Sequence, residues 1–230
     1  MCLQKPQIKF FASPDLVLLM FQSCTLNDLA QFAHCSRVQR NQVRRYLVSQ
    51  MCIALSRFFD RQQQDALFAM LDQSDAGIFG SVTAHITRPD VVLSTADAPR
   101  DVNITIAGGT GPAWHAFMME LGATACSSVP VRVPLMESLL RVTKYAVRSP
   151  KGARQYIYVS ESRTASILVP LLSSEWTHQM TAVLGTKIVV VYPQLHAAGR
   201  TMPGFDVPTR GNWTRWGLRS ALSIYLAEVA

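Results

Sequence analysis

A pair of polar residues at the start of an apolar strand constrains the fold of this 230-residue chain more than any other feature. Residues 102–107 are predicted to form a strand, and Asp101 and Asn103 lie at its beginning. Successive side chains of a strand point to opposite faces of the sheet, so residues two positions apart face the same way. Upstream, Gly80-Ser81 precedes a short predicted helix over residues 82–86. The pattern predicts a sheet that presents Asp101 and Asn103 together on one face.

The order of Gly80-Ser81 and Asp101-Val102-Asn103-Ile104 resembles the metal site of the nucleotidyltransferase superfamily. In that superfamily a Gly-Ser pair opens a helix beside the triphosphate, and an Asp-x-Asp on the next strand holds two divalent cations. The resemblance implies that Gly80 and Ser81 bind nucleotide and that Asp101 and Asn103 hold metal. Asn103, however, offers a carbonyl oxygen without charge, whereas Mg²⁺ favours carboxylates and a two-metal clamp needs dense negative charge. The motif therefore indicates the fold more strongly than the activity.

A longer stretch, residues 76–200, resembles a large family of uncharacterised fungal proteins with a nucleotidyltransferase-like fold. The segments that match, in chain order, are Gly80-Ser81, 99–104, Gly122, 156–159, 177–180 and 191–193. The strand that supplies a third carboxylate in the family has Tyr156 and Tyr158 here. An active enzyme would need another acid near Asp101, and Glu137 and Glu161 are the first candidates.

The first segment, residues 1–74, has helical periodicity throughout and resembles an F-box in residues 13–37. The resemblance implies docking onto the Skp-type linker of a cullin ubiquitin ligase, with leucine side chains buried in a helical groove. The leucines expected to contact this partner are Leu16, Leu18, Leu19 and Leu29. The chain departs from the F-box pattern at 38–40, where the usual tryptophan is absent. The alternative is a helical cap that uses the same leucines as core.

The predicted fold class is α+β: a helical segment over 1–74, followed by a nucleotidyltransferase-like domain over 75–230 with a mixed sheet. A hairpin predicted over 142–160 imposes antiparallel pairing on part of that sheet. Residues 165–172, 176–184 and 216–229 are predicted to be helical. The loop 108–112 precedes another predicted helix, and it either cradles a phosphate with its amides or simply turns the chain.

The amino-acid composition limits the classes of protein to which this chain can belong. Hydrophobic residues make up 49% of the chain and charged residues 16%, which argues against disorder. No apolar run has the length of a membrane span, so we expect an intracellular protein of the cytoplasm or nucleus without a membrane partner. The five cysteines include no CxxC pair, so neither a disulfide framework nor a zinc site is expected.

The net charge of +7 permits contact with nucleic acid without demanding it. Arg37, Arg40 and Arg44 are spaced to share one face of a helix, which is either a solvated face or a basic surface. Near the C-terminus, Trp213 and Trp216 stand among further arginines and could stack on bases.

Three functions are consistent with these patterns. The favoured one is a non-catalytic binding or adaptor protein on a degenerate nucleotidyltransferase-like fold, with a protein partner and no cofactor. The first alternative is an active nucleotidyltransferase that uses Mg²⁺ and a nucleotide. The second is a basic nucleic-acid-binding protein without chemistry.

Overall fold

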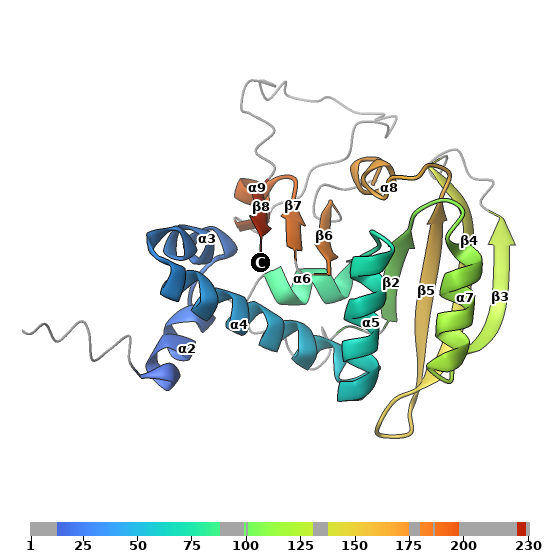
Figure 1. Cartoon of the computed structure of the whole chain (residues 1–230), viewed down its shortest axis with the longest axis horizontal. Helices are drawn as coiled ribbons and strands as arrows, with labels where there is room; N and C mark the ends of the chain where they lie inside the picture. The colour runs from blue at the N-terminus through green and yellow to red at the C-terminus, as the bar shows by residue number, and fades with distance from the viewer. Residues whose placement is uncertain are drawn as a thin grey trace, which may run out of the picture.

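A computed structural model describes residues 13–87, 99, 101–130, 138–174, 180–185, 187–197 and 225–228. Within these residues, a group of helices lies against one mixed sheet (Figure 1). The helices before the sheet are α2 (Pro14–Gln22), α3 (Leu26–Cys35), α4 (Arg37–Leu55) and α5 (Arg61–Gln73). Those that follow are α6 (Ser81–Thr87), α7 (Gly111–Glu120), α8 (Leu168–Leu172) and α9 (Pro193–Ala197). No helix in these described parts of the chain combines the length and apolarity needed to cross a membrane.

The boundaries of the first helices follow from their capping residues. Thr25 and Asp28 form a reciprocal capping box at the start of α3, and Asp60 and Gln63 form another at the start of α5. Between α3 and α4, Ser36 adopts an extended backbone, and its hydroxyl accepts a hydrogen bond from the Gln39 amide. Ser36 thus ends one helix and caps the next, which accounts for the bend expected from the sequence in this region.

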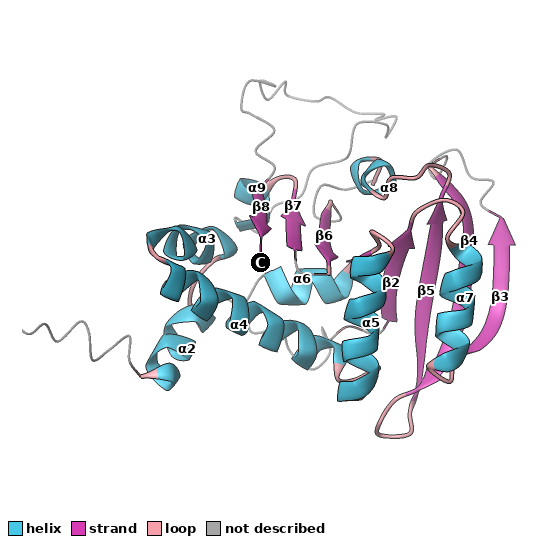
Figure 2. Ribbon diagram, in the orientation of Figure 1, coloured by secondary structure: helices cyan, strands magenta, loops and turns pink. Residues whose placement is uncertain are grey.

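The sheet has eight strands among the described residues, in the order β3-β4-β5-β2-β1-β6-β7-β8. They are β1 (Gly77–Phe79), β2 (Asp101–Ile106), β3 (Thr124–Pro130), β4 (Leu139–Arg148), β5 (Arg154–Ser162), β6 (Thr181–Leu184), β7 (Lys187–Val190) and β8 (Tyr225–Glu228). The strand β2 pairs in parallel with β5, whereas the other neighbours pair antiparallel (Figure 2). The α+β class, the hairpin and the mixed sheet are therefore confirmed.

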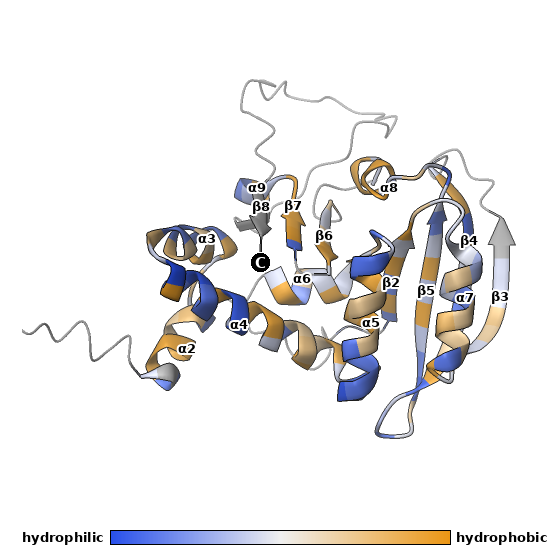
Figure 3. Ribbon diagram, viewed as in Figure 1, coloured by the Kyte–Doolittle hydropathy of each residue, from blue (hydrophilic) through white to orange (hydrophobic). Residues whose placement is uncertain are grey.

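One hydrophobic core joins the helical segment to the sheet. Its buried residues include Leu29 and Leu67 from the helices before the sheet, and Ile104 and Trp114 from after residue 74. The indole nitrogen of Trp114 donates to the Ser74 hydroxyl at 3.1 Å, which is a polar contact between the same two segments. The first half of α4 is hydrophilic, whereas β2 and β7 are largely hydrophobic (Figure 3). The segments 1–74 and 75–230 thus share a core.

Two predicted helices are wrong where the structure describes them. Residues 181–184, expected at the end of a helix, form β6 between β1 and β7. Residues 225–228, expected inside the last helix, form β8 at the edge of the sheet. The remainder of 216–229 and residues 176–179 lie outside the described residues. Both errors arise because pairing with a distant strand overrides the local helix propensity of leucine, alanine and glutamate.

Candidate functional site

The turn from β1 into α6 brings Gly80 against Asn103. Phe79 pairs with Asn103 across the antiparallel β1–β2 ladder, and Gly80 follows with a positive φ of +75°. A Cβ atom on Gly80 would lie 3.2 Å from Asn103 Nδ2, so a larger residue would press on the asparagine amide. Ser81 is the first residue of α6 and is exposed. The structure thus brings together the Gly-Ser turn and the polar strand that the sequence pattern singles out.

Asp101 and Asn103 form a closed pair on the same face of β2. Asn103 Nδ2 donates a hydrogen bond to Asp101 Oδ1 at 3.1 Å, and both residues are half-buried. Two carboxylates at these positions would repel each other unless a cation lay between them. Here the amide N–H takes the role of that cation, since it presents a positive hydrogen to the Asp101 oxygen. One oxygen of Asp101 thus has a hydrogen-bond partner within its own strand.

The neighbouring strand β5 presents aromatic rings beside this pair. Tyr156 is the ladder partner of Asp101 and Tyr158 is the partner of Asn103, so both rings share the face of the polar pair. Lys144 of β4 places its ammonium 3.9 Å from the centroid of the Tyr156 ring and 5.5 Å from that of Tyr158. The guanidinium of Arg154 also lies over Tyr156, at 5.6 Å. Cation–π pairs therefore occupy the part of β5 at which the nucleotidyltransferase resemblance implies a third carboxylate.

Glu161 does not complete an acidic cluster with Asp101. It lies on β5 at odd spacing from Tyr156 and Tyr158, so it points to the opposite face of the sheet. Its carboxylate is buried and accepts a hydrogen bond from the Gly109 amide at 2.9 Å. A Cβ atom on Gly111 would lie only 2.7 Å from Glu161 Oε2. The other candidate acid, Glu137, lies outside the described residues.

The glycine-rich loop before α7 therefore holds an anion that belongs to the chain itself. The residue that precedes α7, Thr110, makes no side-chain capping bond to the helix. Glu161 instead places its negative charge beside the first amides of α7, where the helix dipole favours it. Of the two interpretations of this loop, the turn is supported, because the site that a phosphate would use contains a carboxylate.

The described residues contain no group of three or more His, Cys, Asp or Glu side chains that could hold a metal ion. His85, one turn beyond Ser81 on α6, lies partly buried, and its Nδ1 atom is buried without a hydrogen-bond partner among these residues. Burial lowers the pKa of His85 below its ordinary value. This environment arises from packing of α6 against elements distant in the chain, among them α4 and β2.

The leucines expected to contact a partner fall into two classes. Leu16, Leu18 and Leu19 are exposed to 43%, 41% and 60%, although Val17 on the same helix is buried. Leu29 is completely buried in the core, so it is not part of the exposed surface of this structure. The helix α2 is thus anchored by one face while its other face presents apolar side chains.

The arginines of α4 also separate into two groups. Arg37, Arg40 and Arg44 are all exposed, as a solvated helix face requires. Of these, Arg44 lines a groove beside α5 together with Arg45, whereas Arg37 and Arg40 lie outside it. Trp213 and Trp216 lie outside the described residues, so the structure does not place them beside this surface.

Two comparisons with known proteins identify no relative of this chain. No protein-family model matches the chain, and no curated protein matches it. The function must therefore be inferred from the chemistry of the residues described above.

Proposed function

We propose that this protein is a non-catalytic binding protein, an adaptor on a degenerate nucleotidyltransferase-like fold. The observation that carries the proposal is the hydrogen bond from Asn103 to Asp101 at 3.1 Å. It uses one carboxylate oxygen and replaces the cation that would bridge two acids. A lone half-buried carboxylate is a weak ligand set for Mg²⁺, which is normally bound through carboxylates together with substrate phosphates.

The order of elements around Gly80 supports the nucleotidyltransferase-like part of the proposal. The strand β1 leads through Gly80 into α6, β2 returns antiparallel beside β1, and β5 lies parallel beside β2. This is the arrangement that the resemblance implies for the Gly-Ser turn, the metal-binding strand and the strand of the third acid. The residues that would carry the charge, at 103, 156 and 158, are Asn and two Tyr.

The electrostatics of the sheet face also oppose metal-dependent transfer. Lys144 lies on β4, and one strand separates β4 from β2 in the sheet. Lys144 pairs with Tyr158 and Tyr158 pairs with Asn103, so strand spacing puts the Lys144 backbone roughly 10 Å from that of Asn103. A two-metal mechanism needs a concentration of negative charge at this place. A lysine and a single aspartate, with Arg154 nearby over Tyr156, do not provide it.

The adaptor part of the proposal is supported by α2. Leu16, Leu18 and Leu19 expose between 41% and 60% of their surface on a helix that the core holds in place. Burying a leucine side chain completely contributes about 1.5–3 kcal/mol, so three such residues can anchor a helical partner. A Skp-type linker is the partner that the F-box resemblance implies. Leu29 is not expected to contribute, because it belongs to the core.

Calorimetry with ATP and GTP tests the non-catalytic proposal. The protein and its Asp101→Ala variant are titrated in the presence and absence of Mg²⁺. We expect no Mg²⁺-dependent binding by either protein. Binding that requires Mg²⁺ and is lost in Asp101→Ala would instead establish the enzyme alternative, in which Ser81 holds phosphate and Asp101 with Asn103 holds one cation.

Titration with a purified Skp-type linker tests the adaptor proposal separately. We expect the Leu16→Asp/Leu19→Asp double variant to bind at least about tenfold more weakly than the wild type, because two apolar anchors are lost. Leu168→Asp is a matched control, since Leu168 lies on α8 with 44% of its surface exposed. Absence of binding by the wild type, or an equal loss in the control, contradicts docking through α2.

A further inference from the structure

A groove of about 1010 Å³ runs along the solvent side of α4. The helix α4 lines it with residues spaced at three and four positions, among them Arg44, Arg45 and Ile53. The start of α5 and Pro150, in the turn between β4 and β5, complete its walls. The groove is therefore a feature of the packed fold, formed by three segments that are separate in the sequence.

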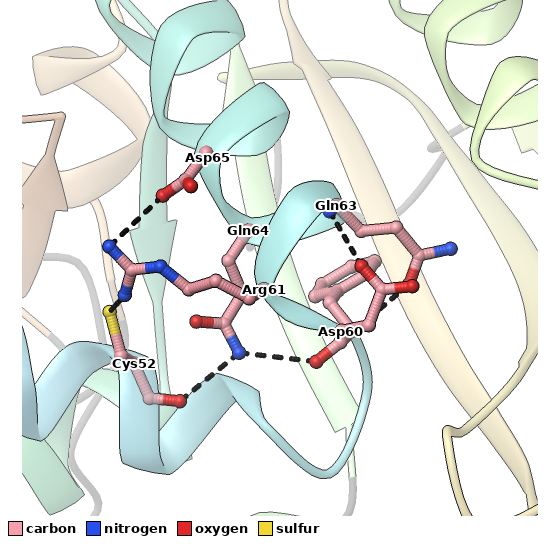
Figure 4. Close-up of polar contacts among 7 residues, drawn as sticks. Cys52, Asp60, Arg61, Gln63, Gln64 and Asp65 are labelled. Atoms are coloured by element: carbon pink, nitrogen blue, oxygen red, sulfur yellow. Dashed lines mark hydrogen bonds and ion pairs between the residues drawn. The ribbon is translucent and has the colours of Figure 1, made fainter.

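Arg61 of α5 contacts two neighbouring side chains at this groove. Its Nη1 atom donates to Cys52 Sγ at 2.8 Å, and its Nη2 atom lies 3.2 Å from Asp65 Oδ1 (Figure 4). The guanidinium thus lies between a residue of α4 and a residue of α5. A guanidinium has five N–H donors, so others are left for a ligand.

The charged residues of the groove are mostly positive. Arg44, Arg45 and Arg61 line it, and Asp60 is the acidic residue among the lining side chains. The Asp60 carboxylate accepts the Gln63 amide at 2.8 Å and is thus used in capping α5. Within the part of the chain that the structure describes, neither Arg44 nor Arg45 forms an ion pair with a carboxylate. Charge complementarity therefore requires a ligand that carries negative groups.

The groove also contains a buried hydrogen-bond acceptor without a partner. The Gln64 amide nitrogen donates to the carbonyls of Cys52 and Phe59 at 3.2 and 3.1 Å, which fixes the orientation of the side chain. Gln64 is only 3% exposed, and its Oε1 atom has no hydrogen-bond partner among the described residues. An unpaired buried acceptor costs about 1–3 kcal/mol. Because this oxygen is itself buried from solvent, it belongs to the wall of the groove and not to the surface that a ligand contacts.

The apolar part of the groove identifies the class of ligand. Ile53 lines it with 54% of its surface exposed, beside Val48 on the same helix. A nucleic-acid backbone offers phosphates but no apolar side chain to cover Ile53. The aromatic residue of the groove, Phe59, is 1% exposed and cannot stack on a base. A peptide supplies carboxylates and apolar side chains together.

We propose that this groove binds an acidic segment of a partner protein. Carboxylates of the segment pair with Arg44, Arg45 and Arg61, and an apolar side chain covers Ile53. The α2 leucines do not line the groove, so this surface is a second one, distinct from the proposed linker-binding surface. A protein with both surfaces would hold two partners at once, which is what an adaptor does.

Fluorescence anisotropy with a short labelled peptide of glutamate and leucine tests the proposal. We expect the wild type to bind the peptide, and added salt to weaken the complex. The Arg44→Glu/Arg45→Glu variant should bind at least about tenfold more weakly, because two attractive contacts become repulsive. The Arg37→Glu/Arg40→Glu variant is the matched control, since it has the same charge and lies on the same helix outside the groove. The affinity of this control variant for the peptide should decrease by less than about threefold.

Two further probes complete the test. A peptide with glutamine in place of glutamate should bind weakly or not at all, and a single-stranded DNA oligonucleotide should not compete with the acidic peptide. The proposal is overturned if the wild type does not bind the peptide, if both double variants lose affinity equally, or if DNA binds in place of the peptide. These results do not depend on the nucleotide and linker titrations, which use Asp101, Leu16 and Leu19.

Discussion

The indole N–H of Trp114 on α7 donates to the hydroxyl of Ser74, directly after α5, at 3.1 Å. Trp114 is completely buried, and its ring packs edge-on against Phe117 at 5.6 Å. This contact connects the last residue assigned to the helical segment with a helix that covers the sheet. Because the contact lies within the shared core, the two segments should unfold together.

Substitutions of these two residues test that shared stability. Ser74→Ala should lower the free energy of unfolding by about 1–3 kcal/mol, since it leaves the indole nitrogen unpaired and also removes the hydrogen bond from the Ser74 hydroxyl to the Met70 carbonyl. Trp114→Ala should lower it by about 3–5 kcal/mol, because a large buried ring is lost. Urea unfolding followed by circular dichroism gives both values. Two separate transitions in the wild type would contradict a common core.

The Asn103→Asp variant tests the role of the amide at the polar pair. We expect it to be less stable than the wild type by about 1–2 kcal/mol without divalent cations, since a hydrogen bond is replaced by repulsion between carboxylates. Added Mg²⁺ or Mn²⁺ should recover part of that stability in the variant but leave the wild type unchanged. Thermal unfolding with and without cation measures both effects. Stabilisation of the wild type by Mg²⁺ would contradict the interpretation that the Asn103 amide takes the place of a cation beside Asp101.

The Glu161→Gln variant tests the carboxylate beside α7. Loss of the charge near the first amides of α7 should destabilise the protein by about 1–2 kcal/mol. Glu120→Gln is the matched control, because Glu120 is the exposed last residue of the same helix. A negative charge is unfavourable at a helix C-terminus, so the control should be neutral or slightly stabilising. Equal losses of stability in the two variants would show that the location of the charge relative to the two ends of α7 does not matter for stability.

His85 should make the stability depend on pH. Its pKa is lowered by burial, so the native state resists protonation and the unfolded state binds the proton more readily. The stability contributed by the neutral ring is therefore complete above the unfolded value of 6.5, and it decreases as the pH falls from there through the lower folded pKa. Urea unfolding at several pH values below neutrality should show this loss. His85→Gln should reduce the slope, and an unchanged slope would assign it to other groups.

The local features of the fold could be predicted because their causes are local. The helical periodicity expected within residues 1–74 is confirmed at α5, Arg61–Gln73, because the apolar stripe of this helix is contained in the segment itself. The strand β2 likewise lies within one residue of its prediction at each end. By contrast, β6 and β8 depend on partners elsewhere in the sheet, and their sequences contain good helix formers.

The candidate site was predictable to a similar extent. The contact between Asn103 and Asp101 follows from their two-residue spacing on a strand. The prediction of Glu161 as a candidate acid near Asp101 is wrong, because the same alternation puts it on the face opposite Tyr156 and Tyr158. The burial of Leu29 agrees with the alternative in which the helices use these leucines as core, and the sequence alone left the two alternatives open because the face of α3 that meets the core depends on how α3 packs on α4. The α4 groove depends on the packing of α4, α5 and the β4–β5 turn.

The hydrogen bond from the Gly109 amide to the Glu161 carboxylate determines how easily an anion from solution can bind the loop before α7. A tethered carboxylate acts at an effective concentration that free phosphate in solution, at millimolar levels or below, does not easily match. Any external anion must also displace a group that the fold has already desolvated. Occupancy of this loop should consequently be insensitive to the surrounding phosphate concentration. A change in the chain itself at residue 161 is what would make the loop responsive to solutes.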